Sequence, residues 1–256
     1  MWHRGAGSPF QEALRGPGDL EITKYLVEEL GVDPNPAGSI HRTVLGQAYI
    51  SGTPGALRYV LDQGADMAAV DRVGNPAVFN IGRRTSGKDI EILEEVLSRG
   101  LRISEDMRDY QGRNILHVAV LGGSKELLER LVGECPGLLQ GRDNDGWTAL
   151  HWVARRRYRS SDENDTEIVR WLLERGCPGI DEAVAVGENE WVPGELAAYH
   201  GAPESVLEAF RRGGWNEGDG QIQAADLHES WNCDCCLAVR YPMPMHQLTD
   251  LLTLFE

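Results

Sequence analysis

The chain lacks the long apolar segment that a membrane protein needs. No apolar run among its 256 residues approaches the roughly 18 consecutive residues from which a membrane-spanning helix is read. The first residues, 1–7, lead directly into the repeated pattern described below, which leaves no room for a signal peptide. We therefore expect a protein of the cytoplasm or the nucleus that does not bind membranes.

Cysteine is scarce, and basic charge is outnumbered by acidic charge. Five cysteines, an odd number, in a chain without a secretion signal do not suggest a disulfide framework. The 25 basic and 40 acidic residues give a net charge of −15, which repels nucleic-acid phosphates over about a Debye length. We therefore expect no nucleic-acid binding. The acidic surface has two interpretations: solubility of a monomer, which we expect, or attraction of a basic partner.

The sequence signatures of common enzymes are also missing. There is no G-x-S-x-G, no H-E-x-x-H and no dinucleotide-binding fingerprint. A phosphate-loop match that begins at Gly82 fails, because Asp89 follows Gly87-Lys88 where Ser or Thr is required. The segment before it, 77–82, also occupies a helical position and not a strand. We predict that the protein is not an enzyme.

A short pattern recurs along the chain, and its clearest copy is DNDGWTALHWVA at 143–154, followed by a helical apolar pattern at 167–176. Alignment on one apolar position of this pattern gives spacings of 35, 33, 38, 34 and 44 residues. The pattern resembles the D-x-x-G-x-T-P-L-H-x-A opening of an ankyrin repeat, whose period is about 33. The aligned positions are Phe10, Leu45, Val78, Leu116, Leu150 and Gly194.

The resemblance implies an all-α solenoid of about six helix-turn-helix units with hairpin loops, over residues 8–214. The second helix of most units is expected to end at a glycine, because the residue after a helix commonly adopts a left-handed backbone. His117 and His151, at the histidine position of the pattern, are expected to hydrogen-bond between neighbouring units and not to catalyse a reaction or bind a metal. The glycines at which the second helices are expected to end are Gly31, Gly64, Gly100, Gly176 and Gly213.

In ankyrin proteins, partners usually contact the hairpin tips and the concave face formed by the first helices. The resemblance therefore implies a protein-interaction scaffold that binds another protein through tips at 70–73, 108–111 and 142–145. Aromatic and arginine side chains commonly dominate such contacts, although each of these could instead cover its neighbour. The candidate residues are Asp71, Arg72, Asp109, Tyr110, Arg113, Asp143, Asn144, Trp147, Trp152, Arg155 and Tyr158.

The fifth unit carries an insertion at 155–165, where four arginines surround a tyrosine and a run of acids follows. One interpretation is an extended helix with a solvated loop that partly neutralises its own charge. The other is an arginine patch for a peptide that bears carboxylate or phosphate groups, which guanidinium groups suit.

The end of the chain does not repeat. We interpret 215–227 as a linker and 228–256 as a poorly ordered tail that resembles the truncated start of a ZZ-type zinc finger, as in fungal ankyrin proteins. Cys233 and Cys236 have the C-x-x-C spacing of two zinc ligands, but no second C-x-x-C follows. We expect no cofactor, with zinc as the alternative. A zinc-holding tail would imply an adaptor in a ubiquitin or chromatin pathway.

Overall fold

The computed structural model describes residues 13–14, 20–33, 43–51, 53–83, 87–122, 124–156, 158, 163–186 and 189–216. These residues form α-helices, two short 3-10 helices (η) and one pair of strands. In chain order they are α2 (Leu20–Glu28), α3 (Val44–Ser51), α4 (Pro54–Asp62), η1 (Ala77–Asn80), α5 (Asp89–Ser98), α6 (Ile115–Ala119), α7 (Lys125–Glu134), η2 (Pro136–Gln140), α8 (Ala149–Ala154), α9 (Glu163–Glu174), β1 (Val184–Val186), β2 (Asn189–Trp191), α10 (Pro193–Tyr199) and α11 (Glu204–Arg212).

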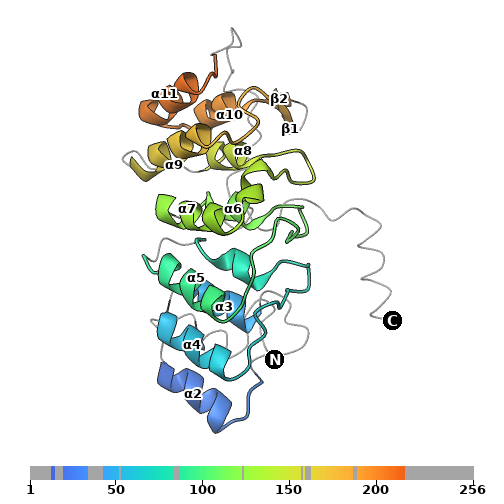
Figure 1. Ribbon diagram of the computed structural model, residues 1–256, viewed down its shortest axis with the longest axis vertical. Coiled ribbons are helices and arrows are strands. Elements are labelled where there is room, and N and C mark those ends of the chain that lie inside the picture. Colours follow the sequence, from blue (N-terminus) through green and yellow to red (C-terminus); the bar gives the residue numbers. More distant parts are fainter. Residues whose placement is uncertain are drawn as a thin grey trace, which may run out of the picture. The chain divides into compact units, whose positions relative to one another are not determined.

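The helices form two parallel rows. The longer, second helices contact one another in chain order, as α2, α4, α5, α7, α9 and α11. The shorter, first helices form the other row, as α3, η1, α6, α8 and α10, and Figure 1 shows the second-helix row stacked along one side. We number the units by their second helices, so that α8 and α9 form unit five and α10 and α11 form unit six. Six second helices match the six units that the repeated pattern predicts.

One continuous core runs through the stack. The aligned positions Leu45, Val78, Leu116 and Leu150 are all at most 2% exposed, because each unit leaves an apolar face that its neighbours cover. Predicted helix ends at Gly31, Gly64, Gly100 and Gly176 have the expected left-handed backbone. At the end of α11 the prediction is wrong by one residue. The backbone of Gly213 is right-handed, and the left-handed residue is Gly214.

Two irregular units depart from regular helix pairs. In unit three the first helix is a single 3-10 turn, η1. Before unit six, β1 and β2 pair antiparallel, with Val184 opposite Trp191. This hairpin and the insertion at 155–165 both lie between the aligned positions Leu150 and Gly194, which are 44 residues apart. The strands could not be predicted from the sequence, because three residues are too few for an alternating pattern to be read.

Unit six is closed by Trp215. The Trp215 side chain is 5% exposed and packs against Gly194, where an added Cβ would lie 2.1 Å from Cδ2 of the indole. The guanidinium carbon of Arg211 lies 5.8 Å from the centroid of the same ring. Trp215 therefore belongs to the packed array, whereas the sequence interpretation placed it in the linker. The indole occupies the space that a leucine side chain at position 194 would fill.

The chain divides into two compact regions, Met1–Gly218 and Asp219–Glu256. None of the second region, Asp219–Glu256, lies among the described residues, so the tail at 228–256 remains a prediction. No helix within the described ranges combines the length and the apolar character that crossing a membrane requires.

Candidate protein-interaction site

Three hairpins with the same local sequence, Asp-x-x-Gly-x, project from the array. We name them tip 3 (70–76), tip 4 (109–113) and tip 5 (143–147), after the unit that each one leads into. In each tip the aspartate N–H donates to the carbonyl four residues later, and the glycine N–H donates back to the aspartate carbonyl. The glycines Gly74, Gly112 and Gly146 have φ of 87°, 75° and 84°, which glycine adopts at least cost.

The aspartate carboxylates fix the three tips in the same way. Oδ1 of Asp71 accepts from the backbone N–H groups of residues 73 and 75, at 3.0 and 2.9 Å. Oδ1 of Asp109 accepts from residues 111 and 113, and Oδ1 of Asp143 from residues 145 and 147. Such side-chain bonds rigidify a turn because they replace water at backbone donors.

The second carboxylate oxygen has a different partner in each tip. Oδ2 of Asp71 accepts from the Asn75 amide within the same hairpin, at 2.8 Å. Oδ2 of Asp109 accepts from the Arg113 guanidinium. Oδ2 of Asp143 accepts from the Trp152 indole of helix α8, at 2.9 Å. Burial raises the pKa of Asp143, although the Trp147 amide and the Trp152 indole oppose this rise by hydrogen bonding to the carboxylate.

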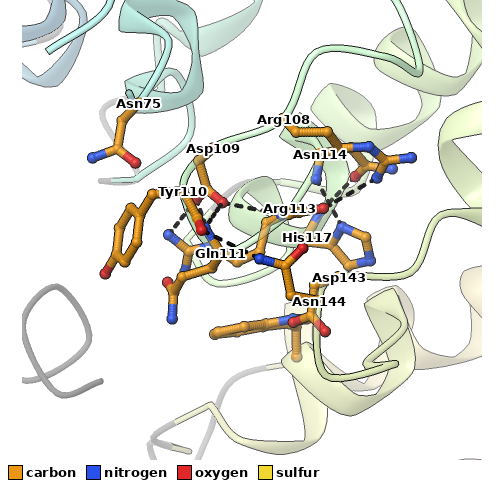
Figure 2. Close-up of polar contacts among 12 residues, drawn as sticks. Asn75, Arg108, Asp109, Tyr110, Gln111, Arg113, Asn114, His117, Asp143 and Asn144 are labelled. Carbon is orange, nitrogen blue, oxygen red and sulfur yellow. Dashed lines mark hydrogen bonds and ion pairs between the residues drawn. The ribbon is translucent and has the colours of Figure 1, made fainter. Parts of the chain in front are cut away.

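Exposed large apolar side chains among the described residues fall into two groups. One comprises Ile22 and Tyr25 on α2 and Leu30 in the turn that follows it. The other lies on tips 3 and 4, where Val70, Val73 and Tyr110 are 56%, 39% and 39% exposed. Exposed apolar side chains on rigid hairpins are suited to protein contact. Figure 2 shows the Tyr110 ring directed away from the polar contacts that hold tip 4.

The structure separates the eleven candidate residues into three groups. Arg72, Tyr110 and Asn144 are exposed. Asp71, Asp143, Arg155 and Tyr158 are half-buried. Asp109, Arg113, Trp147 and Trp152 are at most 8% exposed, which differs from the expectation that they contact a partner. Their side chains are used inside the array, because the carboxylate, guanidinium and indoles contact one another.

Val70 and Val73 lie in the predicted tip at 70–73 but were not among the eleven candidate residues. Apolar β-branched residues ordinarily indicate a buried position, so only their place in a hairpin, between Ala69 and Gly74, could have marked them as exposed.

His117 and His151 bridge neighbouring units, as predicted. Nδ1 of His117 accepts from the Asn114 backbone N–H at 3.0 Å, which leaves the proton on Nε2 to be donated to the Gly141 carbonyl at 3.2 Å. His151 contacts Thr148 through Nδ1 and the Glu182 carbonyl through Nε2, at 2.9 Å. Burial lowers the pKa of His117 to about 3 and that of His151 to about 4, so both rings are neutral at pH 7.

The insertion at 155–165 folds back onto its own unit where it is described. Arg156 forms a 2.6 Å ion pair with Asp165, and both side chains are largely buried. The Tyr158 hydroxyl donates to the Val153 carbonyl at 2.9 Å, and burial raises the pKa of Tyr158. These contacts favour the interpretation in which the insertion neutralises its own charge. The extended helix that this interpretation included is not observed, since α8 ends at Ala154 and α9 begins at Glu163.

The proposed zinc ligands Cys233 and Cys236 lie outside the described residues and remain a prediction. Within the described ranges, no group of three or more His, Cys, Asp or Glu side chains is arranged to hold a metal ion. Of the cysteines there, Cys177 is buried, and this burial raises the pKa of its thiol to about 12.

Comparison with known proteins identifies the repeats. Residues 84–183 match the family model for ankyrin repeats over three copies. An ankyrin repeat domain-containing protein of Stachybotrys chartarum, SAT10, is 29% identical over 140 residues, which are 50% of this chain and 7% of that protein. The ankyrin repeat protein nuc-2 of Neurospora crassa is 26% identical over 206 residues, 77% of this chain and 18% of that protein. The chain thus spans less than a fifth of either curated relative.

Solved structures show the same fold. The ankyrin repeat domain of human ASB11 superposes with a TM-score of 0.60 at 21% identity, covering 82% of this chain and 85% of that one. A chain in the complex of a predatory endopeptidase of Bdellovibrio bacteriovorus with an immunity protein superposes with a TM-score of 0.59 at 17% identity, covering 81% and 98%. The described array is therefore an all-α ankyrin solenoid, and ankyrin repeats are generally protein-interaction modules.

Proposed function

We propose that this ankyrin array is a non-catalytic scaffold that binds a protein partner through its hairpin tips and the adjoining face of the first helices. The observation that carries the proposal is the exposure of Val70, Val73 and Tyr110 on tips 3 and 4. Elsewhere in the described array, exposed large apolar side chains occur only on α2 and in the turn that follows it.

The local geometry supports this use of the tips. Hydrogen bonds from backbone N–H groups to Asp71 and Asp109 hold both hairpins in one conformation. A contact residue on a rigid support loses little conformational entropy when it binds. Tyrosine is a frequent hot-spot residue because its ring buries a large area and its hydroxyl can hydrogen-bond. The Bdellovibrio structure that resembles this array is itself a complex of two proteins.

Site-specific photo-crosslinking tests the proposal. A photoreactive phenylalanine analogue replaces Tyr110 or Val73 in the full chain, and the partner captured in cells is identified by mass spectrometry. The matched control carries the same analogue at Tyr25 on α2, which is 56% exposed. We expect a common partner to be captured at positions 110 and 73 and not at position 25.

Affinity measurements with that partner complete the test. Tyr110→Ala is expected to weaken binding by roughly tenfold, since truncation of a hot-spot residue typically costs more than 1 kcal/mol. Tyr25→Ala should leave the affinity unchanged. Capture at position 25 alone, or an unchanged affinity for Tyr110→Ala, would contradict binding through the tips.

A further inference from the structure

Arg113 links tip 4 to the next unit. Its Nε and one terminal nitrogen each lie 2.7 Å from Oδ2 of Asp109. Its guanidinium carbon also lies 4.8 Å from the ring centroid of Trp152 in helix α8. Arginine can bond to a carboxylate and stack on an aromatic face at the same time, because its guanidinium group is planar. Arg113 therefore links tip 4 to helix α8 of unit five.

Trp152 extends this link to tip 5. Its indole N–H donates to Oδ2 of Asp143 at 2.9 Å, and Oδ1 of the same carboxylate accepts from the Trp147 backbone N–H at 2.8 Å. The Arg155 guanidinium carbon lies 5.9 Å from the Trp152 ring centroid. One indole thus contacts an arginine of unit four, an arginine of unit five and the carboxylate that fixes tip 5.

Tips 4 and 5 also bond to each other directly. The backbone N–H of Asn144 donates to the Gln111 carbonyl at 2.9 Å, and its side-chain amide donates to the Tyr110 carbonyl at 3.3 Å. Together with the path from Asp109 through Arg113 and Trp152 to Asp143, these bonds close a ring of contacts. Figure 2 shows Asn144 beneath tip 4, beside Arg113 and Gln111.

The part of the ring that runs from Asp109 through Arg113 to Trp152 is shielded from water. Asp109, Arg113 and Trp152 are 7%, 8% and 3% exposed, and polar and cation–aromatic contacts are stronger in such surroundings than in water. Tip 3 provides the contrast, since Oδ2 of Asp71 is occupied by Asn75 of the same hairpin.

We propose that tips 4 and 5 form one rigid surface, and that Arg113 and Trp152 are positioning residues which fix the exposed Tyr110 for the partner. The importance of this rigidity for binding rests on the proposed function, in which Tyr110 is a contact residue. The rigidity itself is a property of the free protein. Loss of the Trp152 indole N–H therefore loosens tip 4 as well as tip 5, although Trp152 belongs to neither hairpin.

Amide hydrogen exchange of the full chain without a partner tests this coupling. In Trp152→Phe, the amides of Asn144 and Trp147 in tip 5 and of Gln111 in tip 4 should exchange roughly tenfold faster or more, as expected when a hydrogen bond to a charged group is lost. The Val73 amide of tip 3, which donates to Asp71, should keep its rate.

The matched control is Trp171→Phe in helix α9. Trp171 is as buried as Trp152, at 3% exposure. It also contacts an arginine, because the Arg175 guanidinium carbon lies 5.6 Å from its ring centroid. Its indole N–H has no hydrogen-bond partner within the described residues. The substitution should therefore disturb packing in unit five without accelerating exchange at Gln111.

Equal acceleration at Gln111 in both variants, or acceleration confined to tip 5 in Trp152→Phe, would overturn the proposal. Because these rates are measured without a partner, they do not depend on whether Tyr110 binds one. An unchanged affinity for Tyr110→Ala, with coupled exchange intact, would overturn the proposed function and leave the rigid surface standing.

Discussion

Units four and five place a histidine directly after the aligned leucine, whereas unit six has Glu195 there and Gly194 in place of the leucine. His117 and His151 each accept a hydrogen bond at the start of their helix and donate to a carbonyl of the segment that leads into the next unit. Glu195 makes only the first of these contacts, accepting from the Val192 backbone N–H at 3.4 Å.

The difference follows from position in the array. Unit six is the last unit of the described array, and within the described residues no further unit follows it that Glu195 could bridge to. Its aligned leucine is also replaced by Gly194, and the indole of Trp215, which follows α11 in the chain, fills that space. Terminal repeats commonly differ from internal ones for this reason. Polar contacts from the histidines join the internal units, whereas in the last unit the Trp215 indole packs against Gly194.

The largest expected effect on stability comes from truncating the Trp215 side chain. Trp215→Ala should lower the free energy of unfolding of unit six by about 4 kcal/mol, since truncation of a buried aromatic residue costs about 3–5 kcal/mol. Urea unfolding monitored by amide exchange in α10 and α11 measures this loss. In the double variant Gly194→Leu/Trp215→Ala, the leucine of the repeat pattern refills the space and should restore part of the stability. A double variant less stable than Trp215→Ala would show that the indole does not replace a leucine.

Removing an internal bridge should have the next largest effect. His117→Leu leaves the Asn114 N–H and the Gly141 carbonyl without their partner, and each unpaired buried group costs about 1–3 kcal/mol. We expect a loss of about 3 kcal/mol in the free energy of unfolding, measured by urea denaturation at pH 7. A loss below 1 kcal/mol would mean that water readily replaces the ring and that the bridge is not important for stability.

The bridges also make stability depend on pH. The pKa values of His117 and His151 in the folded protein, about 3 and 4, lie below the value of about 6.5 in an unfolded chain. As pH falls through 6.5 the unfolded state takes up protons first, so each histidine lowers stability by about 1.4 kcal/mol per pH unit from 6.5 towards its folded pKa.

A comparison of variants isolates this contribution. Between pH 6 and 5 the free energy of unfolding should fall less steeply in His117→Leu than in the unchanged protein. The two slopes should differ by about 1.4 kcal/mol per pH unit, the contribution of one histidine. Burial also lowers the pKa of His200 to about 4, so part of the slope remains in the variant. Equal slopes in the two proteins would show that His117 is protonated in the folded state as readily as in the unfolded state.

The internal units could be predicted from sequence in more detail than the terminal one. The histidine position and the 33-residue spacing specified helix pairs and inter-unit hydrogen bonds, because both depend on contacts at fixed sequence separation. The pairing of Gly194 with Trp215 could not be predicted in this way, since it joins two residues only through their positions in space. For the candidate site, the pattern located the tips but not which side chains face outward. Trp147 and Trp152 are buried because arginines and Asp143 contact them, and those contacts depend on the stacking of two units.

The smallest expected effect is at Glu195, and it sharpens the comparison with His117. Glu195→Ala removes one long hydrogen bond at the start of α10 and breaks no contact between units. We expect a loss of about 0.5–1 kcal/mol, the lower part of the range for helix-capping side chains. Urea unfolding of Glu195→Ala and His117→Leu under the same conditions gives the two values directly. If the loss for Glu195→Ala equalled that for His117→Leu, the capping contact would account for the stabilisation in both, and the bond from each histidine to the next unit would contribute nothing.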